Sequence, residues 1–175
     1  PINPKRFQQL AKENIQALIC DSTNVLTPGR SGSEIEVLKT FQRLFVDKRY
    51  KRGRLVAACF ASNVARIKGM ADAARSVGRK VCLLGRSILK TTEAADKCQM
   101  PIHFDHFVDE ETAYRLKPHE VIYICTGSQG DENAAFAKIA RGVHRLRLSA
   151  GDTAFFSSKI IPGNERRVNV LMNNL

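Results

Sequence analysis

Five apolar runs in this sequence are each followed directly by small polar residues of the kind that bind oxygen-rich ligands. Hydroxyl and amide side chains bind phosphate oxygens, and glycine lets a ligand approach the backbone N–H groups closely. The pattern therefore predicts a polar rim that binds phosphate groups. The five polar stretches are Asp21-Ser22-Thr23-Asn24, Ala61-Ser62-Asn63, Gly85-Arg86-Ser87, Thr126-Gly127-Ser128-Gln129-Gly130 and Ser157-Ser158.

Three of these stretches are specific candidates for anion binding. Ser62-Asn63 begins a predicted helix and Arg66 follows one turn later, so free amides and a guanidinium are expected to clamp a phosphate. Gly85-Arg86-Ser87 repeats this arrangement, and Thr126-Gly127-Ser128-Gln129-Gly130 predicts a backbone nest for an anion. Simple capping of the helix that begins at Asn63 is the structural alternative.

Asp21 is the candidate catalytic residue. It ends the first predicted strand, where a carboxylate is costly unless it is paired. An alternative of equal weight is that Asp21 caps a turn through Thr23 or Asn24. The residues alone leave both interpretations open.

The sequence lacks the common metal-ligand, nucleophile and nucleotide motifs. It has no HxHxDH, HExxH or GxSxG string, no Lys after Gly130 to complete a Walker loop, and no GxGxxG after the first strand. His103 and His106 form an HxxH pair, but no third ligand is evident, which favours an ordinary surface pair. We expect no metal ion or other cofactor in this chain.

The cysteines indicate a reducing compartment. Their number is odd, they form no CxxC pair, and most of them lie in apolar runs, which is typical of small buried side chains. A cytoplasmic location is therefore expected. The five are Cys20, Cys59, Cys82, Cys98 and Cys125.

The formal net charge of +11 favours a polyanionic partner, with nucleic acid first. The cations gather partly in residues 48–54 and 141–147. Taken alone, each cluster has an ordinary interpretation as a solvated helix end. The excess over the whole chain is harder to explain in that way.

The spacing of apolar residues predicts alternating strands and helices. This pattern is typical of an α/β, Rossmann-like three-layer domain with a mostly parallel five-stranded sheet, in which the polar stretches share one edge. We expect one domain over 1–175, no membrane span and no signal peptide. Strands are predicted near 16–20, 54–60, 80–84, 120–125 and 152–157, helices over 34–47 (with Ser33 as N-cap), 63–77, 132–141 and 163–174, and loops or short helices over 98–118.

Taken together, these strings resemble the β-CASP domain of bacterial ribonuclease J, in the metallo-β-lactamase superfamily. They run in the family's order over almost the whole chain, and it is the order of five strings that makes the resemblance specific. The strings are Asp21-Ser22-Thr23-Asn24 with Pro28-Gly29 and Ser33-Glu34; Phe60-Ala61-Ser62-Asn63 with Arg66; Gly85-Arg86-Ser87; Cys125-Thr126-Gly127-Ser128-Gln129-Gly130; and Gly151-Asp152-Thr153, Phe156-Ser157-Ser158 and Ile161-Pro162-Gly163-Asn164-Glu165.

The resemblance implies an excised β-CASP domain. The family's zinc-binding HxHxDH motif would precede the first residue, and its later histidine motifs would follow Leu175. In the family, the two halves form a cleft that single-stranded RNA enters, and two zinc ions activate water there to cleave a phosphodiester. The missing metallo-β-lactamase half is thus an expected partner, and the full enzyme an expected homo-oligomer.

By the same resemblance, Asp21 would orient a metal-ligating histidine in the full enzyme. Ser62, Asn63, Arg66, Gly85, Arg86, Ser87, Thr126, Gly127, Ser128 and Gln129 would bind RNA phosphates. The isolated chain would be inactive, and the choice between exo- and endonuclease stays open. A stand-alone nucleotide- or phosphate-binding module without catalysis is the main alternative, and a purely structural interaction domain is another.

Overall fold

The computed structural model describes residues 3–22, 25–29, 32–100, 102 and 104–175. The chain divides into two compact units, residues 1–31 and 32–175. In the first unit, the Asn3 side chain accepts hydrogen bonds from the backbone N–H groups of Lys5 and Arg6 and so begins helix α1 (Pro4–Leu10). Residues 14–22 follow without regular secondary structure and are exposed.

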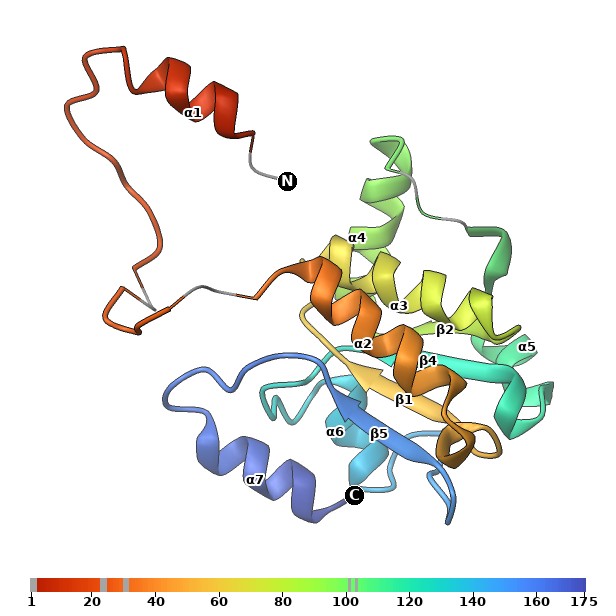
Figure 1. The fold of residues 1–175 in the computed structure, drawn as a ribbon. Helices are drawn as coiled ribbons and strands as arrows, with labels where there is room; N and C mark the ends of the chain where they lie inside the picture. Colours follow the sequence, from red (N-terminus) through yellow and green to blue (C-terminus); the bar gives the residue numbers. More distant parts are fainter. Residues whose placement is uncertain (1–2, 23–24, 30–31, 101, 103) are drawn as a thin grey trace. The chain divides into compact units, whose positions relative to one another are not determined.

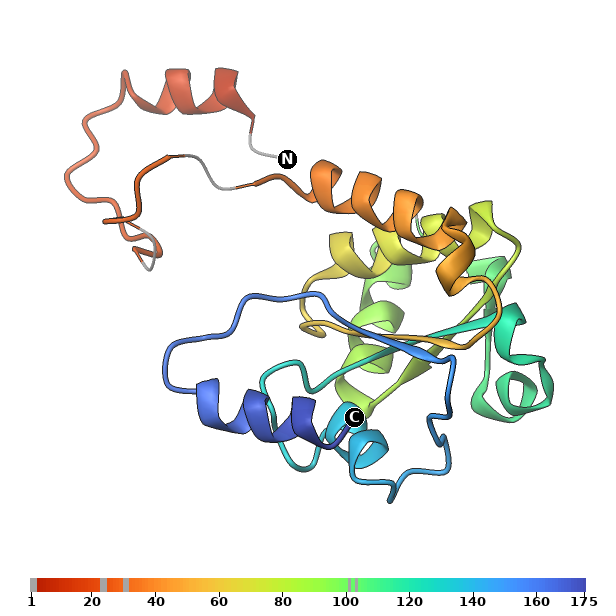
Figure 2. The same ribbon diagram turned by 60° about the horizontal axis from the view of Figure 1, so that its bottom comes forward.

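The second unit is built around a five-stranded sheet with the order β3-β2-β4-β1-β5. Figure 1 labels β1, β2, β4 and β5, and Figure 2 shows the same ribbon turned by 60°. Every pair of neighbouring strands is parallel. The strands are β1 (Leu55–Ala58), β2 (Lys80–Leu84), β3 (Phe107–Val108), β4 (Val121–Cys125) and β5 (Thr153–Phe156). The helices are α2 (Glu34–Val46), α3 (Val64–Ser76), α4 (Arg86–Lys97), α5 (Glu110–Arg115), α6 (Ala135–Ala140) and α7 (Glu165–Asn173), with 3₁₀ helices η1 (Lys48–Tyr50), η2 (Phe104–His106) and η3 (Pro118–Glu120).

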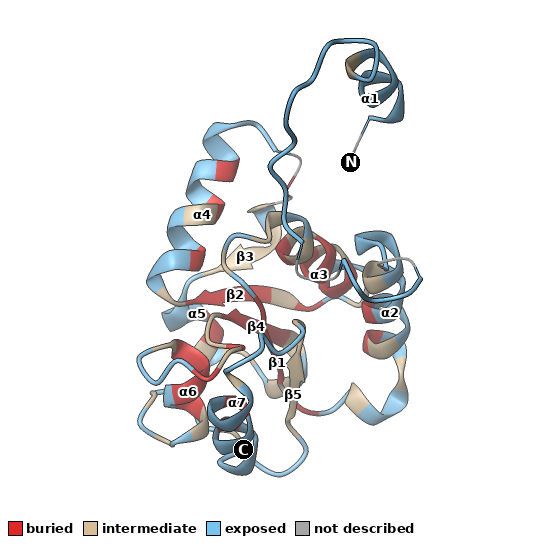
Figure 3. Cartoon of the chain, turned by 90° about the vertical axis from the view of Figure 1, so that its left-hand side faces the viewer, coloured by how far each residue is buried: buried red, intermediate tan, exposed pale blue. Residues whose placement is uncertain are grey.

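The central strands β1, β2 and β4 are buried on both faces, whereas the edge strands β3 and β5 are only partly buried (Figure 3). Successive side chains of a strand point to opposite faces, so an apolar run with no polar alternation supplies both layers of a three-layer fold. In β1, Leu55 and Ala57 join the core on one face, and Val56 and Ala58 join the core on the other. The expected α/β fold with a five-stranded sheet is therefore confirmed.

Helices α2, α3 and α4 contribute to the first-face core, which contains Phe45, Ile67 and Ile88. Helices α5, α6 and α7 contribute to the second-face core, which contains Phe136 and Leu171. Among the described residues, none of these helices combines the length and the apolar composition that a bilayer crossing requires.

Local sequence explains where the best-predicted helix begins. The Ser33 side chain accepts a hydrogen bond from the backbone N–H of Glu36, and the Glu36 carboxylate accepts one from the Ser33 N–H. This reciprocal capping box satisfies two N–H groups that the first turn leaves without helical partners. The predicted N-cap Ser33 is confirmed, and the predicted helix over 34–47 is observed as Glu34–Val46.

One predicted strand is wrong and another was missed. Residues 16–20 form no strand, and both Leu18 and Ile19 are exposed, so the apolar composition of this run does not reflect burial in the structure. The fifth strand is instead Phe107–Val108, inside the region expected to hold loops or short helices. Two residues are too few to show the alternation from which strands are predicted.

Candidate phosphate-binding site

The neighbouring strands β2 and β4 lead to helices on opposite faces of the sheet, and this creates a crevice at the carboxyl ends of the two strands. The helix after β2 joins the first-face core through Ile88, whereas the helix after β4 joins the second-face core through Phe136. In open α/β sheets, such a switch point is where ligands bind, outside the carboxyl ends of the strands.

A pocket of about 560 Å³ lies at this position. It is lined by residues 59–61 after β1, residues 85–87 after β2 and residues 126–129 after β4, together with Lys90, Asp131 and Asn133. The structure thus brings together two of the stretches predicted to bind phosphate, although they lie about forty positions apart in the sequence.

Two glycines with positive φ allow the loops of the pocket to pack closely. A Cβ on Gly85, whose φ is 119°, would lie 2.7 Å from the Thr126 Oγ1 atom. A Cβ on Gly127, whose φ is 109°, would lie 2.5 Å from the Cβ of Ala134. A side chain at either position is therefore excluded both by the backbone conformation and by the neighbouring loop.

The pocket carries groups that suit a phosphate. Helix α4 begins directly after Gly85, which offers no side-chain cap, so its first N–H groups remain available to an anion. Arg86 and Lys90 lie one turn apart on α4, are exposed and line the pocket. Asp131 is the one carboxylate among the lining residues, so cations outnumber anions there.

Cys59 also lines the pocket but supplies no reactive thiolate. The thiol is 1% exposed. Burial raises its pKa to about 12, so it is protonated at neutral pH. Its contribution to the pocket is therefore that of a small apolar side chain.

Ser62, Asn63 and Arg66 are not among the residues that line the pocket. The Asn63 side chain accepts a hydrogen bond from the Arg66 backbone N–H and caps α3. The Asn63 amide donates to Glu34, 3.1 Å away. The capping alternative therefore describes what Asn63 does in this structure.

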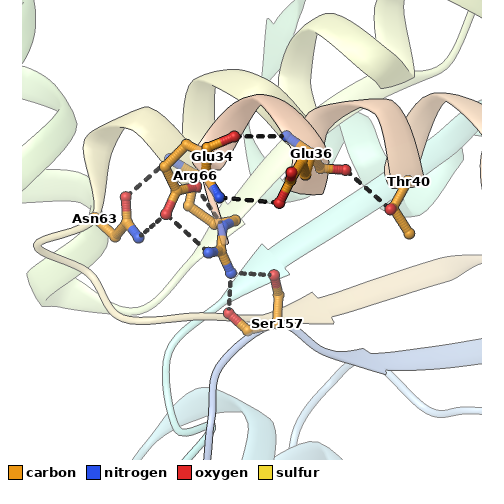
Figure 4. A network of polar contacts seen from close by, with 7 residues as sticks. Glu34, Glu36, Thr40, Asn63, Arg66 and Ser157 are labelled. Carbon is orange, nitrogen blue, oxygen red and sulfur yellow. Dashed lines mark hydrogen bonds and ion pairs between the residues drawn. The ribbon is translucent and has the colours of Figure 1, made fainter. Parts of the chain in front are cut away.

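Arg66 joins three elements of the fold (Figure 4). Its guanidinium donates to both carboxylate oxygens of Glu34, at 2.7 and 2.8 Å, and to the backbone carbonyl and hydroxyl of Ser157, at 2.6 and 2.8 Å. Four of its five N–H groups are thus used within the chain. This geometry favours a positioning role, and phosphate binding by Arg66 stays a prediction.

The Gln129 side chain fastens the pocket loop to the segment after β5. Its amide nitrogen donates to the Ser158 hydroxyl at 3.1 Å and to the Lys159 carbonyl at 2.9 Å. Its amide oxygen accepts from the Ile161 N–H at 2.8 Å. The side chain therefore holds the loop in place, and only the backbone of Gln129 remains for a ligand.

Asp21 lies in the first unit, is exposed and follows residues without regular secondary structure. The turn partners proposed for it, Thr23 and Asn24, and the histidine His103 of the HxxH pair lie outside the described residues. Within the described ranges, no group of three or more His, Cys, Asp or Glu side chains could hold a metal ion. The described residues therefore offer no candidate ligand set for the zinc ions, which the resemblance assigns to the other half of the full enzyme.

Lys90 and Asn133 line the pocket but were not predicted from the sequence. Lys90 follows Arg86 by four residues, so helical periodicity from Gly85 onward would have placed both on one face of α4. Asn133 lies in the short turn before α6, in a stretch that was predicted to be helical. No local signal assigns this residue to a pocket.

A family model described as "Ribonuclease J, beta-CASP domain" matches residues 52–175. The chain is 41% identical over 171 residues to ribonuclease J of Sinorhizobium meliloti, with 97% of this chain and 30% of that protein covered. It is 37% identical over 177 residues to ribonuclease J of Corynebacterium glutamicum, with 100% and 24% covered. It is 38% identical over 170 residues to ribonuclease J of Mycobacterium tuberculosis, with 96% and 30% covered.

The chain thus spans less than a third of the length of these relatives. The family model covers the three loops that line the pocket, and the relatives align over nearly the whole chain. The chain belongs to the beta-CASP domain family of ribonuclease J.

Proposed function

We propose that this domain binds the phosphates of single-stranded RNA for a metal-dependent ribonuclease that hydrolyses phosphodiester bonds. The observation that carries the proposal is the pocket at the carboxyl ends of β1, β2 and β4. There Arg86 and Lys90 stand beside the uncapped start of α4. Cations and backbone N–H groups that converge on one crevice stabilise a phosphate by charge and by hydrogen bonds.

In this proposal, catalysis belongs to the intact enzyme. The metal ions, zinc by resemblance, are held by residues outside the described part of this chain, in a metallo-β-lactamase half. Asp21 orients a histidine that ligates one of these ions. The isolated chain hydrolyses no RNA, and the whole enzyme works in the cytoplasm as a homo-oligomer.

The pocket's chemistry supports binding rather than reaction by this chain alone. Arg86 and Lys90 are basic side chains, and Cys59 is a neutral thiol. The two basic side chains hold and orient a phosphodiester by charge. RNA held here is positioned for a reaction whose remaining groups come from elsewhere.

The test measures fluorescence anisotropy of a 5′-phosphorylated RNA trinucleotide with the chain and its Arg86→Ala/Lys90→Ala variant. Non-specific binding of this electrostatic type has a Kd of about 10⁻⁴–10⁻⁶ M and weakens as salt rises. Removing two charge-assisted contacts, at about 1.5 kcal/mol or more each, is expected to weaken binding about a hundredfold or more. Lys39→Ala/Lys97→Ala is the control, because it removes equal charge from residues that do not line this pocket.

Equal affinity of the two double variants would contradict the assignment of the pocket. A second measurement compares the trinucleotide with uridine monophosphate. Binding of the mononucleotide as tight as that of the trinucleotide would favour the alternative of a nucleotide-binding module without catalysis.

A further inference from the structure

The basic segment 48–54 lies at the opposite edge of the sheet from the phosphate-binding pocket. All five strands are parallel, so residues that precede strands share one edge and residues that follow strands share the other. The segment leads directly into β1, whereas the pocket is lined by residues that follow β1, β2 and β4. The pocket therefore leaves these cations unexplained.

Basic residues from neighbouring strand starts share this edge. Lys117 precedes β4 and Arg79 precedes β2, so they extend the row that begins before β1. Lys51, Arg79 and His119 line one cavity of about 330 Å³ with apolar neighbours. Strands β2, β4 and β1 are neighbours in the sheet, so the residues that precede them lie side by side along this edge.

Arg79 places a buried positive charge beneath this edge. Arg79 is 3% exposed. The guanidinium donates to the carbonyl oxygens of Tyr50 at 2.7 Å, Gly53 at 3.0 Å, Val121 at 3.1 Å and Pro118 at 3.3 Å. All four partners are backbone carbonyls that carry no net charge, so the buried guanidinium has no carboxylate partner among these contacts and adds a positive charge beneath the exposed cations.

Three carboxylates lie close to these cations, and each already has a partner. Asp152, which precedes β5, pairs with Arg54 at 3.2 Å. Asp47 pairs with Arg49 at 2.8 Å. The Glu120 carboxylate accepts a hydrogen bond from the Lys117 backbone N–H at 2.8 Å. Lys48, Lys51, Arg52 and Lys117 are exposed, and their side chains carry charge on long stems that reach solvent.

We propose that Lys48, Lys51, Arg52 and Lys117, the N-terminal edge surface, form a second RNA-binding surface that contacts the sugar-phosphate backbone. The identification of the anion as RNA rests on the proposed function, and the surface itself rests on the geometry above. Exposed lysines and arginines bind nucleic acid by displacing its counterions, without recognising bases. A continuous strand of RNA that fills the pocket thus has a second contact across the length of the sheet.

The distance between the two surfaces sets the length of RNA that can contact both. A strand of five residues such as β4 spans about 17 Å, and the loops at each end add to this. A trinucleotide held in the pocket does not reach the second surface, whereas an RNA of about 20 nucleotides contacts both. The second surface therefore affects long RNA specifically.

The test compares the salt dependence of binding for the unaltered chain, Lys51→Gln/Arg52→Gln and the control Lys39→Gln/Lys97→Gln. Each phosphate contact to a single strand contributes about 0.7 to the slope of log affinity against log salt. For the RNA of about 20 nucleotides, the Lys51→Gln/Arg52→Gln variant is expected to lose about 1.4 from the magnitude of this slope. The control is expected to keep the slope, and the trinucleotide is expected to bind the unaltered chain and both variants alike.

A slope for Lys51→Gln/Arg52→Gln that equals the control's would overturn the proposal, since net charge alone would then explain binding. An unchanged slope with RNA, together with loss of binding to vesicles that contain phosphatidylserine, would also overturn it and assign the surface to lipid. The trinucleotide separates the two proposals. If Arg86→Ala/Lys90→Ala leaves trinucleotide binding intact, the pocket assignment fails while the slope measurement on the longer RNA still decides the second surface.

Discussion

At the scale of single residues, Gly127 is required for the shape of the pocket. Its φ of 109° lies outside the range that a side chain readily adopts, and the space where a Cβ would stand is occupied by Ala134. Gly151 has a similar φ of 95° but open space around it. Substitutions at the two glycines therefore distinguish the cost of backbone strain alone from the cost of backbone strain with a steric clash.

Gly127→Ala is expected to destabilise the fold more than Gly151→Ala. In the control, Gly151→Ala, the left-handed backbone alone destabilises the fold, by about 1–2 kcal/mol. Gly127→Ala must in addition move the loop that carries Ala134. Urea unfolding followed by far-ultraviolet circular dichroism measures both free energies. Equal losses would mean that the loop before α6 moves aside without cost.

The residues of the pocket could be predicted from the sequence better than their partners could. The stretches at 85–87 and 126–129 are visible as polar residues after apolar runs, and parallel strands bring such stretches together. The ion pair of Arg66 with Glu34 joins positions that are 32 residues apart, and neither residue carries a local signal for it. A guanidinium beside a helix start predicts an anion partner, but not whether that anion is a ligand or a carboxylate of the same chain.

At the scale of elements, the Glu34–Arg66–Ser157 network joins the start of α2, the first turn of α3 and the end of β5. The Arg66 side chain is 15% exposed and that of Glu34 is 43% exposed. The hydrogen bonds from Arg66 are the main cause that lowers the pKa of Glu34 below its usual 4.5, and burial opposes them.

This shift predicts acid-sensitive stability. A carboxyl group whose pKa is lower in the folded state stabilises the fold above its unfolded pKa, and this stabilisation is lost as pH falls through the folded value. Glu34→Gln is therefore expected to lower the free energy of unfolding at neutral pH, by at most about 1 kcal/mol because Glu34 is partly exposed. The difference from the unaltered chain should shrink as pH falls below about 4.5.

Urea titrations between neutral and acidic pH test this expectation. Glu132→Gln, which changes an exposed residue between β4 and α6, serves as the charge-matched control. A difference between Glu34→Gln and the unaltered chain that stays constant with pH would show that the network does not depend on the Glu34 charge.

The elements themselves were predicted where burial shapes the sequence over several residues. Strands β1, β2, β4 and β5 and helices α2, α3 and α7 each carry a long enough apolar pattern to be recognised. Helix α6 is shorter than its pattern, because residues 131–134 form a turn before it. The apolar run over 16–20 was predicted to be a strand but is exposed and forms none. Apolar composition alone therefore does not show that a segment is buried.

At the scale of the whole molecule, residues 32–175 contain both cores. Helix α1 has no buried residue, and the described residues of the first unit are exposed apart from the partly buried Leu10. The expectation of one domain over 1–175 stays a prediction. It can be distinguished by experiment from the alternative that residues 32–175 fold without residues 1–31.

Removal of residues 1–31 is expected to leave the free energy of unfolding within about 0.5 kcal/mol, because exposed residues contribute little to stability. Urea unfolding of the two chains under identical conditions measures the difference. Clear destabilisation of the shorter chain would instead support a single domain over the full length.

The strand order has a consequence for synthesis on the ribosome. β1 pairs with β4 and β5, and the last residue of β4, Cys125, lies 67 positions after the last residue of β1, Ala58. At a translation rate of about 5–20 residues per second, roughly 3–13 s pass between the synthesis of β1 and that of β4, its first hydrogen-bonding neighbour. During that interval the unpaired edges of β1 can associate with other nascent chains. Codons that slow translation between 59 and 121 would prolong the wait and lower the yield of folded protein, although every contact of the finished fold would be unchanged.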